Sequence, residues 1–229
     1  MIRALATLSV LLLPLSAAAD SPFLPSRAQF DALFPERIAF YSYEGFVEAV
    51  RQTPGFADSG SDTERRQEMA AFLGQIAHES DQLRAQREYK RENWGKYCRD
   101  DARLSCALGQ QYYGRGPIQL SWNYQYKAAG DFLGLDLWSD PDRVARDSTV
   151  AWRTALWYWM TQPGESRQPA HAAVRSGAGF GATTRAINGP LECDKPNDPE
   201  ARRKNDRRAQ FYKHASELFG VPLMHPLGC

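Results

Sequence analysis

The sequence predicts a mainly α fold in a single domain. Helical periodicity, with apolar residues three and four positions apart, dominates the long segments, whereas strand-like alternation occurs only in short pieces. Neither a low-complexity linker nor a repeat of roughly 20 to 50 residues interrupts the chain. The contents of 43% hydrophobic and 24% charged residues are close to those of average globular proteins, so one sizeable core is expected.

Eight helices are expected from this periodicity, with ends uncertain by about two to four residues. In chain order they are Ser26 to Leu33, Tyr43 to Gln52, Asp62 to Gln82, Asn123 to Leu133, Ser148 to Thr161, His171 to Ser176, Phe180 to Asn188 and Arg202 to Phe219.

The first 19 residues are typical of a secretory signal peptide. Arg3 gives a basic start, an apolar stretch runs from Ala4 to Leu15, and small residues follow up to Ala19. The apolar stretch is shorter than the roughly 20 residues that a membrane-spanning helix needs, which disfavours the alternative of an uncleaved anchor. We therefore expect a leader at 1–19, a single domain at 20–229, and a secreted protein, extracellular or periplasmic, that no longer contacts the membrane.

All four cysteines lie after this leader, and an even number in an oxidising compartment favours disulfides. Three pairings are possible. Cys98 with Cys106 and Cys193 with Cys229 is the pairing that crosses least, and it is the one we favour. A zinc site is the alternative, but the chain has no Cys-x-x-Cys and its histidines show no ligand spacing. Neither a metal nor another cofactor is expected.

Charge gives no sign of a polyanionic partner. Removal of the leader takes away one basic residue, Arg3, and leaves 27 basic residues against 27 acidic ones. A nucleic-acid partner is therefore not expected.

Glu79 stands out on the predicted helix from Asp62. Ser61 and Glu64 form a capping-box signature at the start, and an apolar stripe that includes Phe72 and Ile76 follows. Glu79 comes seven residues after Phe72 and three after Ile76, so it continues the core-facing stripe. Without a compensating charge, partial burial would raise the pKa of this carboxyl group, as a general acid requires. The alternative is a structural glutamate in a salt bridge.

The segment from Tyr112 to Tyr124 suits neither a helix nor a long strand. Gly114 and Gly116 permit a close backbone approach or a positive φ, and Pro117 fixes the next turn. The segment also combines aromatic rings with amides, which suit the apolar faces and hydroxyl edges of sugars. A buried aromatic turn is the alternative interpretation.

Several motifs resemble those of family 19 chitinases. Phe72 to Ser80 resembles the family's acid-bearing helix, Tyr112 to Tyr124 its signature segment, and Ala186 to Cys193 a third motif. These blocks occur in the family's order, and the resemblance covers essentially the whole chain after the leader. It implies a two-lobed, lysozyme-like fold with a substrate cleft between the lobes, and hydrolysis with inversion at the anomeric carbon.

The resemblance places the general acid at Glu79. Inverting hydrolysis also needs a base about 6.5 to 9.5 Å away, which activates water on the opposite side of the bond. The candidates between Glu79 and Cys106 are Glu88, Glu92, Asp100 and Asp101. We choose Glu88, nine residues after Glu79 and ten before Cys98, because this spacing resembles compact bacterial members; Glu92 is the reserve. Ser121 matches the hydroxyl that helps to hold the water.

The resemblance also implies a set of substrate-binding residues and a charge network around the acid. The set is His78, Tyr113, Gln119, Trp122, Tyr124, Gln125, Ile187, Asn188, Glu192 and Arg208. Arg207 is nearly as good a match as Arg208, because the basic run from Arg202 leaves the alignment ambiguous. That run could also be a solvated helix face.

Two departures from the family pattern leave the substrate subclass open. Ser80-Asp81-Gln82-Leu83 follows the acid where the family usually has threonine and glycines, and Gln125 replaces an asparagine. The expected substrate is chitin or another N-acetylglucosamine polysaccharide, cut internally by a monomer. A peptidoglycan-cleaving lysozyme and a catalytically silent sugar-binding protein are the alternatives.

Overall fold

The computed structural model describes residues 21–101, 104–164 and 166–229 and is mainly helical. The predicted leader, 1–19, lies outside the described residues. Within them, β-structure is limited to isolated bridges. The helices are α1 (Arg27–Leu33), α2 (Tyr43–Arg51), α3 (Asp62–Glu79), α4 (Asn123–Leu133), α5 (Ser148–Thr161), α6 (Ala170–Arg175), α7 (Phe180–Glu192) and α8 (Pro199–Phe219), with the 3-10 helices η1 (Arg91–Lys96) and η2 (Pro141–Ala145).

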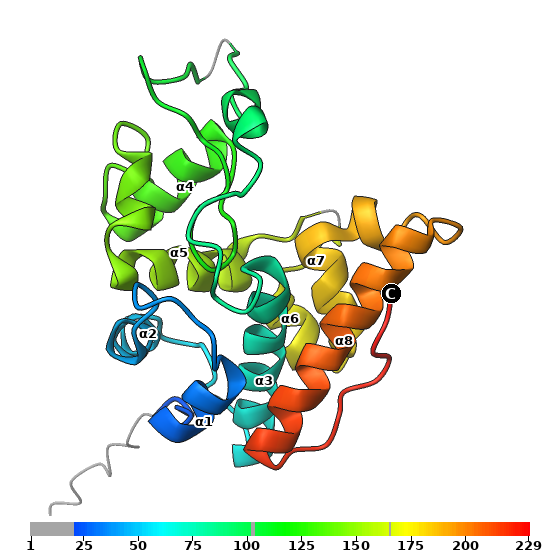
Figure 1. Cartoon of the computed structure of the whole chain (residues 1–229). Coiled ribbons are helices and arrows are strands. Elements are labelled where there is room, and N and C mark those ends of the chain that lie inside the picture. The colour runs from blue at the N-terminus through cyan, green and yellow to red at the C-terminus, as the bar shows by residue number, and fades with distance from the viewer. Residues whose placement is uncertain (1–20, 102–103, 165) are drawn as a thin grey trace, which may run out of the picture.

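The helices form two groups around the central helix α3 (Figure 1). One group contains α1, α2, α4 and α5, with η1 at its far end, and the other contains α6, α7 and α8. Helices α3 and α8 lie side by side, and a side chain on Gly74 would come within 2.8 Å of the Tyr212 backbone. Glycine is therefore required for this close helix pairing.

Trp152 of α5 forms the centre of the core in the first group. It is fully buried, and its ring contacts those of Phe30, Tyr41, Phe46 and Phe72. These rings come from α1, α2, α3 and the segment between α1 and α2, so a single tryptophan joins most of the group. Aromatic pairs of this kind contribute about 0.5–1.5 kcal/mol each beyond the area they bury.

Helix α3 begins as the sequence predicts and ends earlier. Ser61 and Glu64 form the expected capping box, but the helix stops at Glu79 rather than Gln82. Asp81, Gln82 and Leu83 have φ values of 51°, 57° and 63°, which no helix accommodates. Glu79 is thus the last helical residue, at a point where the chain reverses direction.

Other helix ends differ by a few residues from the predicted ones. Helix α7 continues past Asn188 to Glu192. The dihedral angles of Asn188 are non-helical, and Pro190 lies inside the helix. Helix α8 begins at Pro199 rather than Arg202 because Asp198 caps it and proline is tolerated in a first turn. Both 3-10 helices are too short for a periodic pattern in the sequence to predict them.

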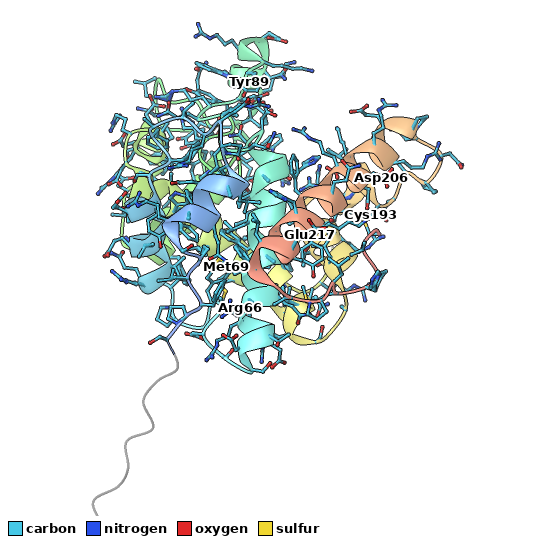
Figure 2. The ribbon with its side chains drawn as sticks, turned by 60° about the horizontal axis from the view of Figure 1, so that its bottom comes forward. Arg66, Met69, Tyr89, Cys193, Asp206 and Glu217 are labelled. Carbon is cyan, nitrogen blue, oxygen red and sulfur yellow. A yellow bond between two sulfur atoms is a disulfide. The ribbon has the colours of Figure 1, made fainter. Side chains whose placement is uncertain are left out.

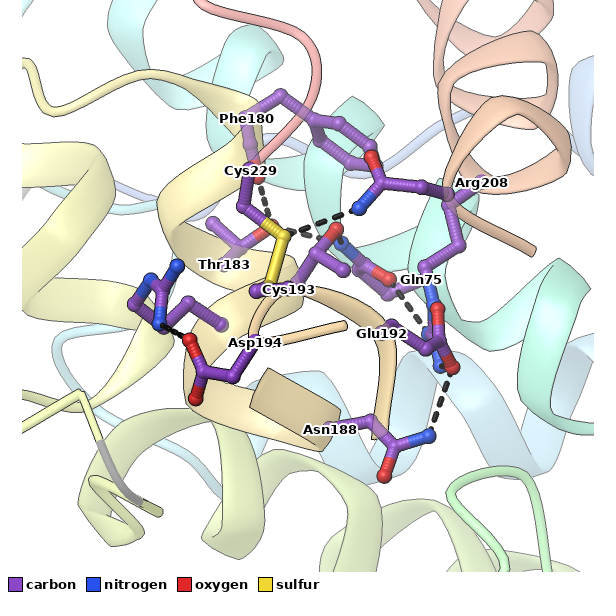
Figure 3. Close-up of a disulfide and its surroundings, with 12 residues drawn as sticks. Gln75, Phe180, Thr183, Asn188, Glu192, Cys193, Asp194, Arg208 and Cys229 are labelled. Atoms are coloured by element: carbon purple, nitrogen blue, oxygen red, sulfur yellow. Dashed lines mark hydrogen bonds and ion pairs between the residues drawn. A yellow bond between two sulfur atoms is a disulfide. The ribbon is translucent and has the colours of Figure 1, made fainter. Parts of the chain in front are cut away.

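Both predicted disulfides are present, Cys98–Cys106 and Cys193–Cys229. All four cysteines are thereby used, so the zinc alternative based on them is wrong. Figure 3 shows how the second bridge ties the C-terminus to the end of α7. Across the described residues, no helix is long and apolar enough to cross a membrane.

A buried carboxylate away from the motifs links α3, α5 and α6. Glu68 is 1% exposed, and its oxygens accept hydrogen bonds from the Trp159 indole and the Ala57 amide, at 3.0 and 3.1 Å. His171 Nδ1 lies 2.6 Å from the same carboxylate. All three partners lose this acceptor together if the carboxylate is removed.

We expect Glu68→Ala to lower the free energy of unfolding by about 3 kcal/mol or more, because buried polar groups are left unsatisfied. Urea unfolding with the disulfides intact measures this change. Glu217→Ala, at an exposed position of α8, is the matched control and should stay near wild type. Equal unfolding midpoints for the two variants would contradict this role.

Candidate active site

A pocket of about 220 Å³ collects most of the predicted site residues. Glu79 reaches it from the end of α3, Asn188 and Ile187 from α7, and Gln125 from α4. The signature segment supplies one whole wall. The complete lining is Glu79, Ile118, Gln119, Leu120, Ser121, Trp122, Gln125, Tyr158, Ile187 and Asn188.

The signature segment forms the wall through a tight backbone turn, as the sequence predicts. Gly116, Gln119 and Trp122 all have positive φ values. The Gln119 side chain is folded back, donating to the carbonyl of Gly116 at 2.9 Å and to that of Ala85 at 3.3 Å. A side chain on Gly114 would lie 2.8 Å from the Gln119 amide oxygen, so glycine permits this packing.

Glu79 forms an ion pair with Arg208, and its side chain is 18% exposed. Arg208 is fully buried on α8, and Glu192 binds it with both carboxylate oxygens at 2.7 Å. The amide oxygen of Gln75 accepts a further hydrogen bond from Arg208 at 2.8 Å. Arg208 rather than Arg207 is therefore the arginine of the predicted charge network, and it supplies a compensating charge beside Glu79.

Opposing effects act on the charges of this network. Burial raises the pKa of Glu192, but the hydrogen bonds and charge of Arg208 outweigh burial and hold this pKa below its ordinary value. Burial opposes the charge on Arg208, but Glu79 and Glu192 raise its pKa. Asn188 donates to Glu192 at 2.7 Å (Figure 3). The Arg208–Glu192 pair is thus a charged pair fixed within the protein.

His78 directly precedes Glu79 at the end of α3 and is not among the residues that line the pocket. Its Nε2 is 3.9 Å from a Glu192 oxygen. Burial, together with the nearby charge of Arg208, lowers the His78 pKa to about 3. His78 is therefore neutral at ordinary pH and cannot act there as a cation toward substrate.

Glu88 lies in the segment that follows the turn after α3. Its amide donates to the Gly114 carbonyl at 2.8 Å, which fixes it to the signature segment. One carboxylate oxygen, Oε1, accepts from Asn93 at 3.1 Å and from the Tyr97 hydroxyl at 3.0 Å. The other oxygen, Oε2, is buried without a hydrogen-bond partner in the protein.

The reserve base lies in a different environment. Glu92 is exposed on η1, whereas Glu88 is partly buried. Although Glu88 does not line the pocket, it is connected to it through Tyr97, whose ring contacts that of Trp122 at 5.5 Å. Burial and the Glu88 carboxylate raise the Tyr97 pKa to about 12, so its hydroxyl stays a donor.

Neither Tyr113 nor Tyr124 lines the pocket, and the two rings lie in different surroundings. Trp94 stacks on Tyr113 at 3.9 Å, and the Arg115 guanidinium lies 3.6 Å from the same ring. Both faces of Tyr113 are thus covered, and it supports Trp94, whose indole donates to the Glu88 carbonyl at 3.0 Å. Tyr124 is exposed and stacks beside Trp122.

Three lining residues are absent from the predicted set: Tyr158, Ile118 and Leu120. Burial, and then the Glu79 charge, raises the Tyr158 pKa to about 12, so its hydroxyl stays protonated beside the pocket. Its place within the apolar stripe of α5 gives it the appearance of a core residue. Its hydroxyl donates to the Ile187 carbonyl of α7 at 3.5 Å, a contact that the local sequence does not reveal.

The helical fold and a pocket that combines one glutamate with amides and aromatic rings define the class, a glycoside hydrolase of lysozyme-like architecture. Residues 29–229 match the family described as Chitinase class I, and the chain belongs to this family, glycoside hydrolase family 19. It is 36% identical to an endochitinase of Phaseolus vulgaris over 247 residues, covering 94% of this chain and 74% of the relative. It is 40% identical to acidic endochitinase SP2 of Beta vulgaris over 212 residues, covering 89% and 68%.

Solved structures agree in fold. Chitinase C of Streptomyces griseus HUT6037 superimposes with a TM-score of 0.84 at 42% identity, covering 89% of this chain and 79% of that one. A bacterial family 19 chitinase gives 0.84 at 47% identity, covering 90% and 100%. A class IV chitinase of Zea mays gives 0.77 at 36% identity, covering 89% and 96%. These matches confirm the predicted family and fold class.

Proposed function

We propose that this chain is a secreted endochitinase that hydrolyses β-1,4-N-acetylglucosamine linkages with inversion, using Glu79 as general acid and Glu88 as general base. The observation that carries this proposal is the contrast between the two carboxylates. Glu79 lines the pocket in an ion pair with Arg208, whereas Glu88 lies outside the lining and is held through Oε1 by Asn93 and Tyr97. Family membership supports the substrate, since the similar relatives are called endochitinases.

The charge network supports Glu79 as the acid. With Glu79 protonated, Arg208 and Glu192 still form a neutral pair with two short hydrogen bonds, so no buried charge is left without a partner. After Glu79 gives its proton to the glycosidic oxygen, the resulting carboxylate lies against Arg208. The network therefore accommodates the acid in both of its protonation states.

The surroundings of Glu88 support its role as the base. Asn93 and Tyr97 hold Oε1, and we assign Oε2, which is buried and has no hydrogen-bond partner in the protein, to accept the proton from water. Ser121 already donates to the Gln119 carbonyl at 2.8 Å, so its oxygen lone pairs are available to accept from the same water. Water then attacks the anomeric carbon from the side opposite the leaving oxygen and gives its proton to Glu88.

The pocket walls suit an N-acetylated sugar. Gln125 and Asn188 present amides, Trp122 presents an aromatic surface, and Tyr158 presents a hydroxyl. Amides pair with acetamido and hydroxyl groups, and aromatic faces cover apolar sugar faces. We assign Gln119, Trp122, Tyr124, Gln125, Ile187 and Asn188 to substrate binding, and His78, Tyr113, Glu192 and Arg208 to support of the two carboxylates.

The disulfides support export. Two bridges in one chain are typical of proteins that fold in an oxidising compartment, and the residues before the described part have the pattern of a leader. We propose a monomer that acts outside the cytoplasm.

Release of soluble sugar from colloidal chitin and from purified peptidoglycan, measured side by side, tests the substrate. We expect release from chitin. Release from peptidoglycan alone would replace the chitinase proposal with the lysozyme alternative.

Tyr97→Phe should lower kcat on N-acetylglucosamine hexamer roughly tenfold, because Glu88 loses one of the two hydrogen bonds that orient its carboxylate. Steady-state kinetics measure this effect. Tyr43→Phe is the matched control, since it removes a hydroxyl that donates to the Pro25 carbonyl far from Glu88. An unchanged kcat for Tyr97→Phe would argue against Glu88 as the base.

A further inference from the structure

The turn between the two carboxylates contains three consecutive residues in the left-handed region. Asp81, Gln82 and Leu83 have φ values of 51°, 57° and 63°, and none of them is glycine. Left-handed conformations are costly for residues other than glycine, and asparagine and aspartate tolerate them best. A run of three therefore needs contacts that hold it in place, and Asp81 stands at its start.

Asp81 joins three separate parts of the chain. Its Oδ1 accepts from Arg84 at 2.9 Å and from Arg207 of α8 at 2.9 Å. Its Oδ2 accepts from the Tyr89 hydroxyl at 3.2 Å. The hydrogen bond and charge of Arg84, together with the hydrogen bonds from Arg207 and Tyr89, lower the Asp81 pKa although partial burial opposes this, so the carboxylate is charged at neutral pH.

Each distant partner of Asp81 is the immediate neighbour of a residue in the catalytic machinery. Arg207 precedes Arg208, which contacts Glu79. Tyr89 follows Glu88, whose amide is bound to Gly114. Tyr89 lies where the segment carrying Glu88 meets η1. In Figure 2 it is far from Arg66 and Met69 of α3. Asp81 thus connects the acid's support on α8 with the segment that carries the base.

The segment that carries Glu88 is also fixed to the signature segment. Glu88 donates to Gly114, and the Gln86 carbonyl accepts from the Gly116 amide at 3.1 Å. The segment therefore follows the signature segment, whereas Glu79 follows α3 and α8. The turn at 80–84 is the direct chain connection between Glu79 and the segment that carries Glu88, and Asp81 braces that turn.

We propose that Asp81 is a positioning residue that sets the placement of Glu88 relative to Glu79. The proposal rests on the proposed function, because it takes these two glutamates as base and acid. Asp81 is not among the residues that line the pocket. It acts through Arg207 on one side and through Tyr89 on the other.

Asp81→Asn tests the proposal, because asparagine has the same shape and tolerates the left-handed region while losing the charge that holds two arginines. On N-acetylglucosamine hexamer we expect kcat to fall roughly tenfold with KM within about twofold, since small misplacement of catalytic groups mainly costs rate. Glu36→Gln, which removes only the exposed second partner of Arg84, is the matched control and should keep its kcat.

A double-mutant cycle separates positioning from a merely structural role. Tyr89→Phe should lower kcat in the wild-type background and have no effect in the Asp81→Asn background, since the Tyr89 hydroxyl acts through Asp81. Thermal unfolding of each variant reports any loss of stability separately. An unchanged kcat for Asp81→Asn overturns the proposal, as does an equal Tyr89→Phe effect in both backgrounds, which would instead indicate that the 65% exposed Tyr89 contacts substrate itself.

Failure of this proposal is distinguishable from failure of the proposed function. Glu79→Gln and Glu88→Gln, measured in the same assay, report on the roles of acid and base. Loss of activity in both of these variants with an unaffected Asp81→Asn rejects the positioning role alone.

Discussion

Glu79→Gln is expected to lower kcat on N-acetylglucosamine hexamer about a thousandfold, because the amide cannot give a proton to the glycosidic oxygen. The variant should fold normally, since glutamine has the same size and can still accept a hydrogen bond from Arg208. We expect KM to change little, because the carboxyl group acts mainly in the transition state. Steady-state kinetics with product chromatography measure both constants.

The leaving group distinguishes an acid from any other essential carboxyl group. A chitooligosaccharide with a 4-nitrophenol leaving group needs little protonation at the bond that breaks, so Glu79→Gln should recover much of its lost rate on it. If Glu79→Gln lost the same factor on both substrates, Glu79 would not be the acid.

Glu88→Gln is expected to cause a loss of similar size, about a thousandfold in kcat, for a different reason. Glutamine retains the shape of the side chain and an acceptor for Asn93 and Tyr97, but it cannot take the proton from water. The loss should be equally large on the nitrophenyl substrate, because water activation does not depend on the leaving group.

Glu92→Gln is the matched control for the base. Glu92 is exposed on η1, four residues from Glu88, and its replacement should leave kcat near wild type. The opposite pattern, with Glu92→Gln inactive and Glu88→Gln active, would move the base to Glu92.

The sequence predicted well those parts of the fold that depend on interactions between residues close together in the chain. The capping box at Ser61 placed the start of α3, and its apolar stripe placed Glu79 on the inner side. The end of α3 was wrong, because helical periodicity continues through Gln82 while the left-handed turn is held by Asp81 and by tertiary packing. Such contacts with α8 leave no signal in the local sequence.

The resemblance to the family predicted most of the pocket lining, including Gln119, Trp122 and Asn188. It could not determine which arginine of the basic run reaches Glu79, because both Arg207 and Arg208 fit the motif. The structure brings Arg208 to Glu79 and Arg207 to Asp81, a choice fixed by the pairing of α8 with α3. Tyr113 illustrates the opposite limit, since its motif position does not reveal that Trp94 and Arg115 cover its ring.

The most direct test of the central claim is the configuration of the first product. Proton NMR of N-acetylglucosamine hexamer hydrolysis, recorded before mutarotation equilibrates the ends, identifies the anomer released by the wild-type enzyme. Acid catalysis by Glu79 with water activated by Glu88 on the opposite face predicts the α-anomer from the β-linked substrate. Early release of the β-anomer would contradict this mechanism.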